Sequence, residues 1–140
     1  MPKKSTSPDL VELMLGRVDA ADSGDIAAMT SFFAADAVWD SAPMGMEVYE
    51  GRVAIGHFFE EWWGTYEMSG AKAEEMVDLG NDVTFAVLTL KGRPIDSGGE
   101  VRLRYAAVTE WVDGVVVRET NYIDIDEARF AAERLVASKE

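Results

Sequence analysis

The sequence predicts a single α+β domain in which three N-terminal helices pack on a curved, mainly antiparallel sheet. In the first half of the chain the apolar residues recur at helical spacing, and from about Ala71 onward they alternate with a period of two. A capping box formed by Asp124 and Glu127 predicts a short helix after the last strand, through about Val136. Helices, then a run of strands, then a helix are typical of an α+β layout.

The first helix is expected to start at Ser7 and Pro8, because a capping hydroxyl followed by proline suits the first turn of a helix. Gly24 is the expected stop. We expect residues 1–7 to form a disordered tail and residues 8–140 to form the one domain. The apolar stripe of this helix is Val11, Met14, Leu15 and Val18.

Two more helices and an early strand complete the first half. Asp25 is expected to cap a short second helix, and the segment Ala37–Ala42 predicts a strand. A third helix is expected over Arg52–Tyr66, after a loop that contains Pro43. The stripes that these two helices would bury are Ile26, Met29, Phe32 and Phe33 in the second, and Ile55, Phe58, Phe59 and Trp62 in the third.

The second half reads as four strands joined by turns. "AKAEEMVDL" alternates loosely, and "DVTFAVLTLK" is nearly all apolar, as a central strand would be. A longer connection, "GRPIDSGG", leads to "EVRLRYAAVTEW". This strand and "VVVRETNYID" flank Asp113 and Gly114, which predicts a hairpin.

Composition excludes several classes of function. The 140 residues include 13 Lys and Arg against 26 Asp and Glu, and the net charge of −13 repels nucleic acid and anionic membranes. The chain has no cysteine, and no segment approaches the roughly 18 apolar residues of a membrane span. The N-terminus lacks the apolar core of a signal peptide. A soluble cytoplasmic protein is expected. Because His57 is the only histidine, we expect no metal site and no cofactor.

The register of the last hairpin decides which way Glu119 and Asn121 point. A bare two-residue turn at Asp113 and Gly114 would mix polar and apolar side chains on both faces of the sheet. A three-residue turn over Val112–Gly114 separates the faces and pairs Ala107 with Glu119. We therefore predict the three-residue turn, with Glu119 and Asn121 on the inner, apolar face.

A carboxylate on an apolar face has two interpretations. Glu119 can be satisfied by Asn121, Tyr105 or water and do no chemistry. Alternatively, it is a general acid or base in a closed pocket, where burial would raise its pKa well above the usual value for a glutamate.

Two stretches carry a resemblance to a known family. "FFAADAVWDSAPMGMEVYEGRVAIGHFFEEWW" and "WVDGVVVRETNYIDIDEARFAAERL" resemble the SnoaL-like and limonene-epoxide-hydrolase-like members of the NTF2-like superfamily, which also contains the ketosteroid isomerases. The resemblance implies a cone-shaped barrel with a deep pocket for an apolar ligand. Members of this superfamily catalyse different reactions or none, so the fold alone does not fix the reaction.

The machinery of the epoxide hydrolases does not carry over to this sequence. That family has an Arg and an Asp on the central strand, where this chain has Leu88 and Leu90. The aspartate of the last strand is replaced by Asn121, and the Tyr and Asn that hold the water are replaced by Trp39 and Ser41. Epoxide hydrolysis is not expected.

The cyclases and ketosteroid isomerases of this superfamily use a pocket carboxylate from the first strand. In this chain that position is Ser41 or, with a shift of one residue, Asp40. The remaining candidate for proton transfer is Glu119, with Asn121, Ser41 and Tyr105 as hydrogen-bond donors to a developing oxyanion.

The resemblance also implies a pocket wall of aromatic and aliphatic side chains, although aromatic residues on a helix are more commonly core. The candidate ligand-binding residues are Trp39, Phe59, Trp62, Tyr66, Leu88, Leu90 and Leu103.

We expect a protein that binds a small apolar molecule and that acts as an isomerase or cyclase by moving a proton next to a carbonyl. The alternative is a non-catalytic binding or dimeric interaction module. Members of the superfamily often form homodimers through the outer face of the sheet, where Val83, Phe85 and Val87 would lie.

Overall fold

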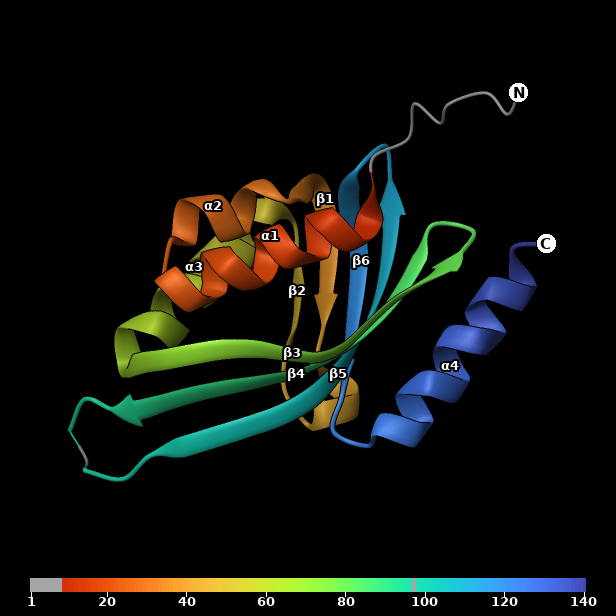
Figure 1. Ribbon diagram of the computed structural model, residues 1–140. Helices are drawn as coiled ribbons and strands as arrows, with labels where there is room; N and C mark the ends of the chain where they lie inside the picture. Colours follow the sequence, from red (N-terminus) through yellow and green to blue (C-terminus); the bar gives the residue numbers. More distant parts are fainter. Residues whose placement is uncertain (1–8, 97) are drawn as a thin grey trace.

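A six-stranded, strongly curved sheet forms the centre of the molecule in the computed structural model, which describes residues 9–96 and 98–140 (Figure 1). The strand order is β2-β1-β6-β5-β4-β3. All neighbouring strands are antiparallel except β1 and β6, which run parallel. The strands are β1 (Phe33–Asp40), β2 (Val48–Glu50), β3 (Tyr66–Gly80), β4 (Val83–Pro94), β5 (Val101–Val112) and β6 (Val115–Tyr122).

Three α-helices, α1 (Leu10–Ser23), α2 (Ile26–Ser31) and α3 (Arg52–Thr65), lie against one face of this sheet, and α4 (Ile125–Ser138) lies against the other (Figure 1). A short 3₁₀ helix, η1 (Ala42–Met44), follows β1. The α+β architecture expected from the sequence is therefore confirmed.

Side-chain caps set the helix boundaries. The carboxylate of Asp9 accepts hydrogen bonds from the backbone N–H groups of the first turn of α1, and Gly24 ends this helix in the left-handed conformation, as expected. Asp25 caps α2 and Asp124 caps α4, both as predicted. The expected helix start at Ser7 and the tail over residues 1–7 lie outside the described residues.

The strands begin earlier than the sequence pattern indicated. β1 starts at Phe33, which was assigned to the buried stripe of the second helix, and β3 follows α3 directly at Tyr66. The short strand β2 was missed, because three residues show too little alternation to be recognised. The longer β3 and β4 pair along most of their length and run beneath α1 and α3 in Figure 1, so the curved sheet extends below the helices.

The last hairpin corrects the predicted turn. Asp113 and Gly114 have φ of 51° and 80°, so they form the two-residue turn of the primed type, and the three-residue turn is wrong. A bulge then leaves Val117 without a partner on β5, and beyond it Thr109, not Ala107, pairs with Glu119. The extra residue restores the separation of the two faces, so Glu119 still points inward.

The outer face of the sheet is not free for a partner at the place that the sequence suggested. Val83, Phe85 and Val87 are buried beneath Ala128 and Ala132 of α4. The prediction that these three residues form a dimer surface is therefore wrong. The expected layout placed the helices on one face of the sheet, whereas α4 covers the other.

Within the described residues, no helix combines the length and the apolar character that crossing a bilayer requires. Residues 9–96 and 98–140 also bring no three His, Asp or Glu side chains close enough together to hold a metal ion.

Candidate functional site

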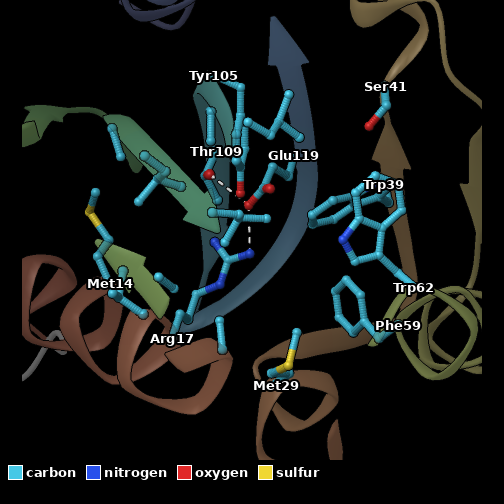
Figure 2. Close-up of a pocket in the computed structure, with 18 of the residues that line it drawn as sticks. Met14, Arg17, Met29, Trp39, Ser41, Phe59, Trp62, Tyr105, Thr109 and Glu119 are labelled. Carbon is cyan, nitrogen blue, oxygen red and sulfur yellow. Dashed lines mark hydrogen bonds and ion pairs between the residues drawn. The ribbon is translucent and has the colours of Figure 1, made fainter. Parts of the chain in front are cut away.

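A cavity of about 100 Å³ lies between the three N-terminal helices and the inner face of the sheet (Figure 2). Its walls are mostly apolar. Of the expected ligand-binding residues, the cavity is lined by Trp39, Phe59, Trp62, Leu88, Leu90 and Leu103. Tyr66 is not part of the lining, and its ring packs instead against Trp62, with the ring centroids 5.3 Å apart.

The polar end of the cavity is formed by Glu119. Its side chain is only 2% exposed, and it projects from β6 beside Thr109 of β5, its cross-strand neighbour (Figure 2). Thr109 Oγ1 donates a hydrogen bond of 3.3 Å to Glu119 Oε1. Arg17 Nη2 forms an ion pair of 2.6 Å with the same oxygen. The other oxygen, Oε2, takes part in neither of these two contacts.

Arg17 is the functional residue that the sequence reasoning missed. It lies on α1 three residues after Met14, so helical periodicity turns both side chains toward the cavity. Its guanidinium lies 5.0 Å from the ring centroid of Phe33 and 5.9 Å from that of Trp111. The sequence held one signal that could have identified Arg17. It is a cation on the buried face of an amphipathic helix, and the inward-facing Glu119 is a carboxylate that such a cation could pair with.

The ion pair changes the chemistry that was expected of Glu119. From the sequence, pairing, hydrogen bonds or a proton could all relieve the burial of this carboxyl, but the partners named for it were Asn121, Tyr105 and water, not a cation. A guanidinium at 2.6 Å instead balances the charge within the protein. The end of this mostly apolar cavity therefore holds a carboxylate with a cation beside it.

Tyr105 lies on β5 on the same face as Thr109 and lines the cavity. Burial raises the pKa of its phenol well above the ordinary value, and the negative charge of Glu119 adds to this effect. The phenol therefore keeps its proton throughout the neutral range and remains available as a hydrogen-bond donor.

Ser41 and Asn121 form a second polar pair. Asn121 Nδ2 donates a hydrogen bond of 3.2 Å to Ser41 Oγ, and both side chains are buried. Ser41 lines the cavity, whereas Asn121 does not. Asn121 therefore reaches the site through Ser41. Among the described residues, Asn121 Oδ1 and Trp39 Nε1 are buried without a hydrogen-bond partner.

Asp40 and His57 lie away from the cavity. Asp40 Oδ2 forms an ion pair of 2.6 Å with Arg118, and Oδ1 accepts a hydrogen bond from the backbone N–H of Ala42. Asp40 was the alternative position for a first-strand carboxylate. These contacts hold its side chain outside the cavity. His57 is exposed on α3.

The rest of the wall combines flat and flexible side chains. The rings of Trp39 and Phe59 meet edge to face with their centroids 5.2 Å apart. Several methionines, which the sequence reasoning did not assign to the site, also line the cavity: Met14, Met29, Met44, Met46 and Met76. Methionine adapts to irregular shapes and contacts aromatic rings favourably, so this wall suits a small flat ligand.

A family model described as a SnoaL-like domain matches residues 16–119. Three solved structures share the fold with high coverage. A candidate isomerase from Bacillus subtilis is 22% identical, with a TM-score of 0.71 over 87% of this chain and 92% of that one. A candidate polyketide cyclase from Pseudomonas putida KT2440 is 20% identical, with a TM-score of 0.67 over 82% and 91%.

The third is a protein from Catenulispora acidiphila DSM 44928 with a ketosteroid isomerase-like fold, in complex with trimethylamine. It is 12% identical, with a TM-score of 0.72 over 91% of this chain and 95% of that one. At these identities the likeness concerns the fold. No curated protein matches the chain significantly.

Proposed function

Since the chain belongs to the SnoaL-like domain family, we propose that its cavity binds a small, largely apolar ketone and moves a proton next to the carbonyl. The observation that carries this proposal is the placement of Glu119. Its carboxylate is almost fully buried and lines a mostly apolar cavity, and its contacts with Arg17 and Thr109 both fall on Oε1, which leaves Oε2 for a ligand. A positioned carboxylate of this kind suits general base catalysis.

The proposed step begins when Oε2 of Glu119 takes a proton from the carbon next to the ligand carbonyl. The C–H bond breaks, an O–H bond forms on Glu119, and the electron pair moves through the new C=C bond onto the carbonyl oxygen, giving an enolate. Tyr105 and Ser41 both line the cavity, and in this proposal one or the other donates a hydrogen bond to this oxygen, with Asn121 holding Ser41.

The protonated Glu119 then returns its proton. In an isomerase the ligand is a ketone with a C=C bond one carbon further along, the intermediate is a dienolate, and the proton goes to its far carbon, which moves the C=C bond into conjugation with the carbonyl. In a cyclase the enolate carbon attacks a second carbonyl of the ligand, a C–C bond forms, and the resulting alkoxide takes the proton. The apolar walls around Trp39 and Phe59 exclude water from the enolate in either case.

Deuterium exchange into 2-indanone tests the proposal, because this small ketone has acidic C–H groups beside its carbonyl. We expect the protein to accelerate exchange of these hydrogens in D₂O, followed by proton NMR, and Glu119→Gln to lower the enzymatic rate about a hundredfold. Glu75→Gln is the matched control, because Glu75 pairs with Arg129 on the opposite face of the sheet. An unchanged rate in Glu119→Gln would refute the role of this carboxylate.

One observation favours a second candidate function, a binding module without chemistry. The ion pair with Arg17 occupies Oε1 of Glu119 and balances its charge within the protein, which is also what a purely structural buried pair would do. On this alternative, 2-indanone would bind in the cavity, which ligand-observed NMR would detect. Its hydrogen–deuterium exchange would be no faster than in buffer without the protein.

We also propose a cytoplasmic location, which the cysteine-free composition fits, and a homodimer. Because α4 covers the apolar part of the outer face, the remaining surface for a dimer is its charged end, around Arg102 and Arg104 of β5. A salt-sensitive dimer in sedimentation equilibrium would support this contact, and a monomer at every concentration would exclude it.

A further inference from the structure

We infer that Arg17 is the group that binds the ligand oxygen as it becomes an enolate, an inference that rests on the proposed function above. Figure 2 shows Arg17, Tyr105 and Glu119 converging on the same end of the cavity from α1, β5 and β6. Tyr105 and Ser41 are neutral donors, whereas Arg17 brings a positive charge to the oxygen on which negative charge develops.

The guanidinium of Arg17 has more N–H donors than its contact with Glu119 uses. It carries N–H groups on three nitrogens and no acceptor. Its ion pair with Glu119 is made by Nη2, which leaves the N–H groups on Nε and Nη1 outside this contact. The side chain is 18% exposed and lines the cavity, so a ligand oxygen there would find a charged donor without displacing a protein partner.

The cation is also held in place before the ligand arrives. The rings of Phe33 and Trp111 flank its guanidinium at 5.0 Å and 5.9 Å from their centroids, and both rings are almost fully buried. A charge fixed in a poorly hydrated site needs no reorganisation when an oxyanion forms, which makes it effective in stabilising one.

Charge balance explains why the cavity contains an ion pair instead of a lone carboxylate. When the proton moves from carbon to Glu119, the negative charge moves from Glu119 to the ligand oxygen. Arg17 lies beside both positions, so the site stays neutral before and after the step. Creating a separated charge in such an apolar cavity would be unfavourable, because an ion buried without a partner loses its hydration and gains no opposite charge.

This arrangement defines the class of ligand. One end of the molecule must carry an oxygen that can become negative, within reach of Arg17, and the acidic hydrogen must lie beside Glu119 Oε2. Small ring ketones and their enol or phenol tautomers meet both requirements. A phenolate of similar size should therefore bind as a mimic of the enolate.

The test uses 4-nitrophenol, whose phenolate form is yellow and whose phenol form is nearly colourless. Glu119→Gln leaves Arg17 without its carboxylate, so we expect this variant to bind the phenolate about tenfold or more tightly than the wild type. Adding Arg17→Gln to that variant should lose at least about tenfold again, while Arg17→Lys in the same background should keep part of the affinity. None of these variants leaves a buried unpaired carboxylate, and circular dichroism verifies their folding.

Equal phenolate affinity in Glu119→Gln with and without Arg17→Gln would overturn the inference and leave Arg17 a structural partner of Glu119. Undetectable binding in all variants would overturn it as well. Failure of the proposed function is a separate result, because it is measured by the dependence of 2-indanone exchange on Glu119 and not by phenolate binding.

Discussion

At the scale of single residues, the ion pair between Arg17 and Glu119 explains why a charged side chain is found on the inner face of the sheet. Buried ion pairs contribute little to stability and can often be replaced by apolar residues without loss. Keeping one at the end of an apolar cavity is therefore better explained by chemistry than by folding. Removing only Arg17 would strand the carboxylate, which is why Glu119→Gln is the starting point of the binding experiment.

Tyr105 provides a pH test at this scale. Because burial raises the pKa of its phenol in the folded protein, the neutral form stabilises the fold. This contribution is fully present below the ordinary tyrosine value and is lost only as the pH rises through the higher folded value. We expect the phenolate absorbance of the wild type and of Tyr105→Phe to rise together through the ordinary range. A smaller rise in the variant over that range would show that Tyr105 ionises normally.

Single residues also show where sequence reasoning succeeds and where it stops. The alternation of β5 and β6 was enough to turn Glu119 and Asn121 inward. It could not reveal Arg17, because this residue is about 100 positions away from Glu119 in the chain and the two meet only through the packing of α1 on the sheet. Periodicity describes one element at a time, so partners on different elements stay hidden from it.

At the scale of elements, the β5–β6 hairpin shows a correct conclusion reached through a wrong register. The Asp-Gly signal predicted the turn, but the bulge at Val117 could not be read from the run of valines that precedes Arg118. The turn differs from the predicted one by one residue, and the bulge adds one more. Each one-residue shift turns the side chains to the opposite face, so the two together restore the original orientation. Glu119 therefore faces inward under both registers.

The last helix, α4, is predicted to stabilise the molecule by covering the outer face of β4 and β5. Ala132 is fully buried against this face, so Ala132→Glu should lower the free energy of unfolding by about 3 kcal/mol in urea denaturation. Glu133→Ala, one residue later on the exposed side of the helix, should change it by less than about 0.5 kcal/mol. Similar losses in both variants would mean that α4 does not pack in this way.

At the scale of the whole molecule, the layout of helices and strands could be predicted, but the cavity could not. Periodicity, caps and turn residues each act locally, and together they indicated the α+β architecture. A cavity is the volume left over when side chains from many elements meet, and its methionine-rich wall follows no sequence spacing. The residues taken from the family resemblance include much of the cavity wall. The methionines of this wall could be identified only from the three-dimensional structure.

The central claim is that the end of this cavity formed by Arg17, Tyr105 and Glu119 binds a ligand oxygen. A crystal structure of the Glu119→Gln variant with 4-nitrophenol tests it most directly. The account predicts the phenol oxygen within hydrogen-bond distance of the Arg17 guanidinium, with the ring against Trp39 and Phe59. A ligand bound elsewhere, or lying in the cavity with its phenol oxygen turned away from Arg17, would contradict it.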